Sequence, residues 1–450
     1  MPEYGAVRNI EASAHEEGTA YMTVDAHAMG KFEPYVYRTS DYGQSWQKIT
    51  NGISDSKLSY CRMIKEDPIR SGMLYLGTEN ALYLSYDNGD TWQSLMTNLP
   101  ASPMYWMDIP EHFNDLVVGT YGRGIWILDD LTPLQQYTEA VATSDMHLFA
   151  PKDAYRFHPV SNTMQFYPSA SAGTDPPFGA SLHYWLSEDK AESMKDSISL
   201  VFTTEAGDTV RTMQHEGTAG FNRVWWDFYD DPTTELVMRT KPRYAEWFPM
   251  EEDRTREAPF SPMSHMVPPG TYQVHLVIGD EVQTQTLKVL KDPNSEGTEE
   301  DIQQQMELLA KIKVDFGNIS VTVNEIEQIR RQLLDMKPML TGSASEVKEM
   351  FTTVDSTILE LENEIIQLKT TGFGQDGVRF PGKLMKKLSY LSSAVATGDF
   401  SPPNQHQEVY EELHARWEDV EGRWNTYKEG SLNELITKLQ ENQIGPLVSQ

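Results

Sequence analysis

The chain has 450 residues and carries 37 basic and 67 acidic side chains, which gives a formal net charge of −30 at pH 7. A chain of this length can bury sizeable cores and is expected to form about three domains. The excess of acidic residues argues against nucleic-acid binding and against attachment to anionic membranes, because both require basic surfaces.

The sequence contains no apolar run long enough to span a membrane, and residues 1–5 lack the basic and apolar regions of a signal peptide. Cys61 is the single cysteine, so no intrachain disulfide can form, and a buried structural thiol is expected there. No pair of histidines has the spacing of a zinc site, and no cofactor motif has the strand and helix context that it needs. Neither a metal nor a cofactor is therefore expected.

Two copies of one short pattern lie near the N-terminus. The first consists of Thr39, Asp41, Gly43, Ser45 and Trp46, and the second, 46 residues later, of Ser85, Asp87, Gly89, Thr91 and Trp92. Each copy follows a strand-like run and is expected to form the turn of a β-hairpin. Asp accepts hydrogen bonds from nearby backbone N–H groups, Gly permits positive φ, and Trp can pack as an apolar plug between neighbouring sheets. We predict that both copies occupy equivalent turns of adjacent four-stranded sheets, with both tryptophans buried.

The repeat extends beyond these turns. Residues 8–21 line up with residues 62–75, and a third copy over residues 105–128 ends in Asp129-Asp130 without a third turn pattern. A repeat of this length with several short strands in each unit is typical of β-propeller blades. The sequence thus predicts a partial β-propeller of two to three blades over residues 1–135.

The two turn patterns resemble the BNR or Asp-box repeats of neuraminidase-like and sortilin-type propellers. Residues 120–134 look like the last blade of large secreted bacterial proteins that are often named glycosyl hydrolases. The resemblance implies that the boxes are structural and lie away from any active site. It also implies that the parent protein is extracytoplasmic, either periplasmic or secreted. Upstream propeller blades of that parent would then be packing partners of residues 1–135.

Residues 135–145 are predicted to be a linker. Residues 146–292 are predicted to form a β-sandwich, because short alternating strands follow one another between turns. The runs over residues 220–227 and 268–272 resemble paired strands of bacterial immunoglobulin-like modules. The stretch of residues 230–267, which is rich in Pro, Met and charge, is predicted to be a long surface insertion.

From residue 297 onward, apolar residues recur at spacings of three and four, which predicts helices. Helices are expected over about residues 302–333, 345–368, 381–396, 404–427 and 431–439. Together they predict an antiparallel helical bundle over residues 297–445 that folds on its own, because its apolar stripe can bury its own face. The predicted fold class is therefore multidomain, mainly β and then α.

Candidate site residues come from the third repeat copy and from one loop. Asp108 is a candidate carboxylate for glycoside hydrolysis, and Arg123 is a candidate for binding a substrate carboxylate. Capping of turns and strands is the favoured role for Asp108. Tyr121, beside Arg123 in a Gly-rich turn, and Trp247, in a predicted loop, are candidate ligand-binding residues.

The preferred interpretation is a non-catalytic recognition or scaffold protein whose propeller binds a peptide or a glycan. The alternative is a neuraminidase-like glycoside hydrolase whose active site needs the additional blades, since one arginine is not the cluster that such a site requires. A convergent pair of carboxylates or an arginine cluster on the axial face would favour the hydrolase.

Overall fold

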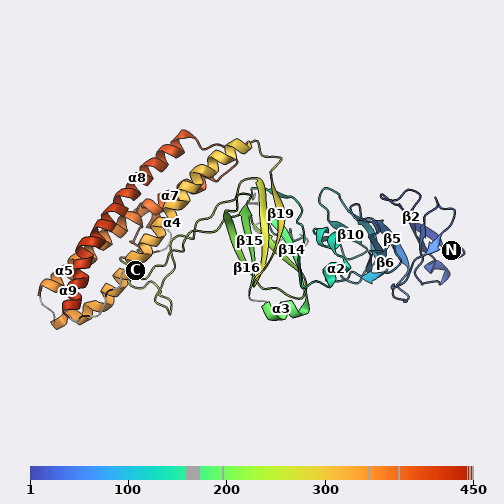
Figure 1. Ribbon diagram of the computed structural model, residues 1–450, viewed down its shortest axis with the longest axis horizontal. Coiled ribbons are helices and arrows are strands. Elements are labelled where there is room, and N and C mark those ends of the chain that lie inside the picture. The colour runs from blue at the N-terminus through green and yellow to red at the C-terminus, as the bar shows by residue number, and fades with distance from the viewer. Residues whose placement is uncertain are drawn as a thin grey trace.

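The computed structural model describes residues 1–158, 173–194, 197–342, 345–372, 376–442, 444 and 447. Three small β-sheets at the N-terminal end are followed along the long axis by two facing sheets and then by a group of long helices (Figure 1). The order of β elements followed by α elements agrees with the predicted fold class.

The first part of the chain forms three antiparallel sheets that pack one against the next. The first contains β1 (Ala6–Ala12), β2 (Ala20–Asp25), β3 (Val36–Thr39) and β4 (Gln47–Lys48); the second contains β5 (Cys61–Glu66), β6 (Leu74–Thr78), β7 (Leu82–Ser85) and β8 (Gln93–Ser94); the third contains β9 (Met104–Asp108), β10 (Leu116–Thr120) and β11 (Ile125–Leu128). The strands follow sequence order within each sheet, and neighbouring sheets share apolar cores. This arrangement is consistent with a partial β-propeller.

In both copies of the repeated turn pattern the Asp carboxylate holds the turn by the same bonds. Asp41 accepts hydrogen bonds from the backbone N–H of Ser45 at 2.8 Å and from its hydroxyl at 2.6 Å. Asp87 accepts the same two bonds from Thr91 at 2.8 and 2.6 Å. The bonds from Ser45 lower the pKa of Asp41 to about 2. The Gly of each box has a φ above +80°, a region that glycine adopts without strain, which explains its place in the pattern.

The two box tryptophans differ in burial. Trp92 is 4% exposed, and its indole Nε1 donates to the carbonyl oxygen of Ile49 in the first sheet at 3.0 Å. Trp46 is only partly buried, because no sheet among the described residues covers its outer side. The prediction that both side chains are buried is therefore correct for Trp92 and wrong for Trp46.

Replacing Asp87 with Ala is expected to cost about 1–3 kcal/mol of folding stability. The variant removes a charged acceptor and leaves the N–H and hydroxyl of Thr91 without their partner, beside the buried Trp92. Asp41→Ala is expected to cost less, because the Trp46 that follows it packs against less of the protein. Urea unfolding of the two variants checks this order, and equal losses would contradict the packing role of Trp92.

Two further sheets face each other across one apolar core. One contains β12 (Met146–Leu148), β14 (Ala180–Leu186) and β17 (Gly220–Trp226), and the other contains β13 (Ala154–Arg156), β15 (Ile198–Thr204), β16 (Thr209–His215), β18 (Gly270–Ile278) and β19 (Glu281–Lys291), with α3 (Glu188–Met194) between β14 and β15. Trp226 and Phe202 stack across this core with ring centroids 4.3 Å apart.

The predicted linker, residues 135–145, instead holds the last residues of the short helix α1 (Thr132–Gln136) and all of α2 (Glu139–Ala142). Arg70 of the second sheet explains why this stretch is ordered. Its guanidinium donates to the carbonyl oxygens of Leu134 at 3.2 Å and Tyr137 at 2.6 Å. The guanidinium of Arg70 thus adds a cationic donor at the C-terminal end of α1.

The helical part has its own core. Its helices are α4 (Glu299–Met336), α5 (Ser345–Ile365), α6 (Asp376–Arg379), α7 (Leu384–Val395), α8 (Asn404–Tyr427) and α9 (Asn433–Glu441); the other helical turns of the chain are η1 (His27–Met29), η2 (Lys337–Gly342) and η3 (Lys428–Leu432). At the start of α4, Thr298 and Asp301 form a capping box, which satisfies N–H groups of the first turn.

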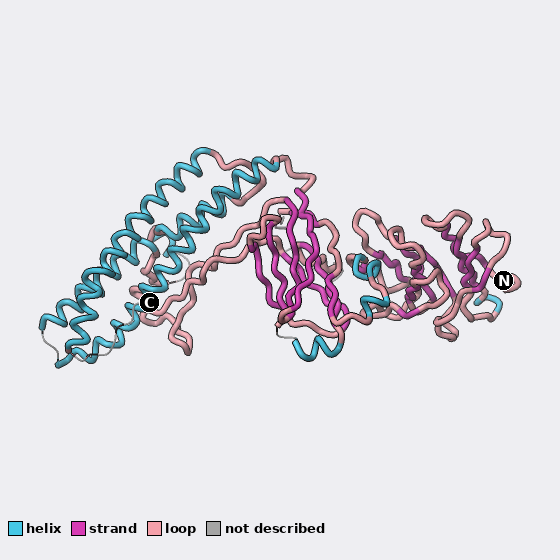
Figure 2. The backbone as a smooth tube through the Cα atoms, viewed as in Figure 1, coloured by secondary structure: helices cyan, strands magenta, loops and turns pink. Residues whose placement is uncertain are grey.

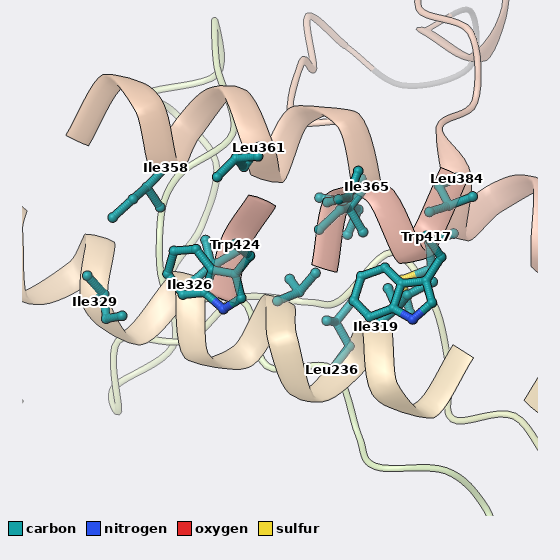
Figure 3. Close-up of a cluster of buried hydrophobic side chains, with 14 of the residues drawn as sticks. Leu236, Ile319, Ile326, Ile329, Ile358, Leu361, Ile365, Leu384, Trp417 and Trp424 are labelled. Atoms are coloured by element: carbon teal, nitrogen blue, oxygen red, sulfur yellow. The ribbon is translucent and has the colours of Figure 1, made fainter. Parts of the chain in front are cut away.

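Residues 230–267, which we call the strap, run as an irregular segment that connects the facing sheets to the side of the helices (Figure 2). Leu236 and Met238 of the strap are buried in the core of the helices. Figure 3 shows Leu236 among side chains such as Ile319 of α4 and Trp417 of α8. The prediction of a surface insertion is therefore wrong, because apolar residues of the strap complete a core.

The strap also satisfies a buried carboxylate of α4. Glu327 accepts hydrogen bonds from the backbone N–H of Thr240 at 2.6 Å and from its hydroxyl at 2.5 Å. Arg330 donates to Glu362 of α5 at 2.5 Å and lies 3.3 Å from Glu327. Both glutamate side chains are fully buried. Burial, and next the charge of Glu327, raises the pKa of Glu362 well above its usual value.

Candidate functional site

One residue bulges out of the first strand of each of the three N-terminal sheets. These residues are Arg8 in β1, Arg62 in β5 and Tyr105 in β9. A bulge leaves its residue unpaired and redirects the side chain. The side chains of Arg8 and Arg62 both reach Asp25, and the guanidinium of Arg62 lies 5.3 Å from the ring of Tyr105, so the bulges share one face. We define the bulge cluster as Arg8, Asp25, His27, Tyr60, Arg62, Glu79, Tyr105 and Tyr121.

Asp25 is the buried centre of the cluster on the first sheet. Its carboxylate accepts hydrogen bonds from Arg8 Nη2 at 2.8 Å, from the backbone N–H of His27 at 2.9 Å, and lies 2.6 Å from His27 Nδ1. Burial raises the pKa of Asp25, but the hydrogen bonds from His27 and Arg8 outweigh it and hold the pKa below its usual value. The Asp25 carboxylate is thus a charged acceptor that is already paired with Arg8 and His27.

Arg62 is held between two aromatic rings. Its guanidinium lies 4.9 Å from the ring centroid of Tyr60 and 5.3 Å from that of Tyr105. Arg62 also donates to Glu79 at 2.6 Å. The ring of His27 stacks on the ring of Tyr60, with the ring centroids 4.6 Å apart. Cation–π contacts and an ion pair together fix the planar guanidinium in one orientation.

Two tyrosine rings form the solvent-exposed part of the cluster. Tyr105 is 51% exposed and Tyr121 is 75% exposed, and their ring centroids lie 6.0 Å apart. In contrast, the carboxylates of Asp25 and Glu79 are occupied by arginine and histidine donors. The cluster therefore offers exposed aromatic faces beside fixed positive charge, and it offers no carboxylate that is free to act as an acid or base.

The structure separates the two residues predicted as catalytic candidates. Asp108 pairs with Val117, whereas Arg123 lies in the turn after Thr120, which pairs with Met104 at the other end of β9. Four residues of strand separate the two ends by roughly 13 Å. Asp108 lies 4.0 Å from Lys65, and the Arg123 carbonyl oxygen accepts a hydrogen bond from Trp126. The two side chains do not form one site.

Of the other predicted site residues, Tyr121 joins the bulge cluster and Trp247 does not. Trp247 lies in the strap, is 53% exposed, and has its ring centroid 5.9 Å from that of Phe248. Among the described residues, no group of three or more His, Cys, Asp or Glu side chains is placed to hold a metal ion. None of the helices described here is long and apolar enough to cross a membrane.

A cavity of about 300 Å³ lies between the three N-terminal sheets and the facing sheets. Its walls are mainly apolar, and its polar end contains Asp130, His183 and Arg223. The Asp130 carboxylate accepts hydrogen bonds from Ser181 and from the backbone N–H of Thr132, and Arg223 Nε donates to His183 Nε2 at 2.8 Å. Burial lowers the pKa of His183 to about 4, so the ring is neutral. The Ser181 bond joins the segment after β11 to β14, and Arg223 of β17 also donates from Nη2 to the carbonyl oxygen of Asp129 at 2.8 Å.

No protein-family model matches this chain, and no curated protein matches it. Among solved structures, YCF48 bound to D1 peptide is 20% identical over 28% of this chain and 37% of that chain, with a TM-score of 0.21. The extracellular domain of a putative one component system from B. thetaiotaomicron is 12% identical over 64% of this chain and 31% of that chain, with a TM-score of 0.21. A GH74 enzyme from Niastella koreensis is 9% identical over 63% of this chain and 46% of that chain, with a TM-score of 0.23.

The chain spans less than half the length of each of these three solved structures. With TM-scores of 0.21 to 0.23, these similarities do not assign a ligand or a reaction to the chain.

Proposed function

We propose that this chain is the recognition part of an extracytoplasmic protein, built from a partial Asp-box propeller, an immunoglobulin-like sandwich and a helical bundle. It binds a peptide or a glycan on the bulge cluster without catalysing a reaction. The observation that supports this is the position of Arg62 between Tyr60 and Tyr105, with the exposed ring of Tyr121 beside them. Rigid aromatic rings next to a fixed arginine are typical of binding surfaces.

The hydrolase alternative has less support from the geometry. A glycosidase needs two carboxyl groups across the scissile bond, and those of the bulge cluster are occupied by basic partners. Asp108 and Arg123 lie at opposite ends of β9. Turnover of a glycoside by the protein that is abolished in Asp108→Ala or Arg123→Ala would favour the hydrolase instead.

The double variant Tyr105→Ala/Tyr121→Ala tests the recognition proposal. On peptide and glycan arrays, ligands that bind the wild-type chain are expected to bind the variant about tenfold more weakly or worse, because the exposed aromatic faces are lost. Tyr390→Ala is the matched control, since Tyr390 on α7 is also 75% exposed but lies outside the cluster. Unchanged binding by the double variant, or equal losses in both variants, would refute the proposed site.

A further inference from the structure

The cavity between the three N-terminal sheets and the facing sheets is lined mainly by apolar side chains. On the third sheet, Leu116 pairs with Leu128, and Val118 pairs with Trp126, so these four side chains lie on one face of β10 and β11. Leu82 of the second sheet lines the same cavity. The volume of about 300 Å³ lies at the lower end of the range for small-molecule sites. The cavity therefore has room for a small apolar body.

The polar end of the cavity is built on β14 and β17. His183 and Arg223 are direct partners in the pairing of these two strands. Their neighbours Leu182, Tyr184 and Val224 belong to the core between the facing sheets. Because side chains alternate along a strand, His183 and Arg223 lie on the other face of their sheet, where they line the cavity.

The hydrogen-bond acceptors at this polar end are already bonded within the protein. The Asp130 carboxylate accepts two hydrogen bonds from neighbouring residues. His183 accepts from Arg223 through Nε2, so its ring proton is on Nδ1, which lies 3.7 Å from the Asp130 carboxylate. The side-chain oxygen of Asn222 accepts from the N–H of Thr218, and its NH₂ group donates to backbone carbonyl oxygens. A ligand that only donates hydrogen bonds would therefore find its acceptors occupied.

The guanidinium of Arg223, in contrast, has donors left. Its Nε donates to His183 and its Nη2 to the carbonyl oxygen of Asp129, both at 2.8 Å, and these two bonds fix its orientation. In the part of the chain that the structure describes, Nη1 donates to no acceptor and Arg223 forms no ion pair with a carboxylate. The chain has 67 acidic and 37 basic side chains, so a cation without an acidic partner is uncommon in it. A free guanidinium edge beside apolar walls fits the carboxylate of an apolar ligand.

We propose that this cavity binds a small monocarboxylate with an apolar body, such as a medium-chain fatty acid. The carboxylate accepts hydrogen bonds from Arg223, and the apolar body lies against side chains such as Leu116 and Val118. His183 is a positioning residue, because it orients the guanidinium of Arg223. The cavity shares no residue with the bulge cluster, so this inference does not depend on the ligand of that cluster.

Calorimetric titration of the full chain with octanoate and with octanol tests the proposal, because the two probes share an apolar body and differ in charge. Octanoate is expected to bind with a Kd of about 0.01–1 mM, and octanol about tenfold more weakly or worse. Arg223→Met is expected to remove this difference by weakening octanoate binding alone. Arg223→Lys restores the positive charge, so it is expected to recover part of the octanoate affinity.

Two further variants locate the binding. Leu99→Trp, at a partly exposed loop position that lines the cavity, fills its apolar part and is expected to weaken both probes. Arg243→Met removes an exposed arginine outside the cavity and is expected to leave both affinities unchanged. Thermal unfolding confirms that each variant is folded. Equal affinity of the wild type for the two probes, no binding of octanoate at millimolar concentration, equal losses in Arg223→Met and Arg243→Met, or unchanged binding in Leu99→Trp would each overturn the proposal.

Discussion

Arg330→Met is expected to lower the free energy of unfolding by about 3–5 kcal/mol at pH 7, since it leaves Glu327 and Glu362 buried side by side without their shared cation. Methionine keeps most of the side-chain volume, so the loss is electrostatic and does not come from a cavity. Urea unfolding followed by circular dichroism of the helices measures it. Arg331→Met is the matched control on the same turn of α4, because Arg331 pairs with the exposed Asp335 and should contribute less than about 1 kcal/mol. Equal losses in the two variants would contradict the role of the buried cluster.

The same cluster determines a pH dependence. Burial, and next Glu327, raises the pKa of Glu362 in the folded state. Its contribution to stability is then fully present below the unfolded pKa, which is about 4.3, and is lost as the pH rises towards the folded pKa. Glu362→Gln resembles the neutral form, so the variant is expected to match the wild type near pH 4 and to exceed its stability at pH 8. Glu364→Gln is a control of opposite sign, because Arg423 lowers the pKa of Glu364.

The features that the sequence predicts well are those with local physical causes. The two repeated turns follow from hydrogen bonds between residues at most four positions apart, and both turns are built alike. Helix α8 begins at Asn404 and ends at Tyr427, as the apolar spacing predicts. Strands β14 and β18 lie within residues 146–292, where alternation between flanking turns predicts short strands.

The features that the sequence does not predict depend on distant partners. Burial of Trp46 depends on a neighbouring sheet and not on its own box. Apart from Tyr121, the residues of the bulge cluster were not predicted as site residues, although the sequence contains a signal for them. The three repeat copies are aligned from Arg8, Arg62 and Tyr105, and these are the bulged residues. An arginine begins the first two repeat copies, at the edge of a predicted strand. This recurrence could have predicted that the arginine side chains lie on the same face of neighbouring sheets and form a site there.

The strap is the clearest case of a long-range effect. Met238 is fully buried in the core of the helices, so Met238→Ala is expected to cost about 2–5 kcal/mol through lost apolar contact and the cavity that remains. Met29→Ala is the control, because Met29 is 54% exposed and its loss should stay within about 0.5 kcal/mol. Thermal unfolding of the full chain compares the two. If Met238→Ala loses as little stability as Met29→Ala, the strap contributes little to the core of the helices.

The strap contacts also affect whether residues 297–445 can fold alone. Without the strap, the helices lose the side chains of Leu236 and Met238 from their core, and Glu327 loses the N–H and hydroxyl of Thr240. A buried carboxylate that loses its donors disfavours the packed state, whereas the helical spacing of the sequence persists. We therefore expect the fragment 297–445 to be helical by circular dichroism but to melt over a broad range. Addition of a peptide of residues 230–267 should sharpen the transition, because it restores both the apolar side chains and the donors. A sharp transition of the fragment without the peptide would show that the helices form their core unaided.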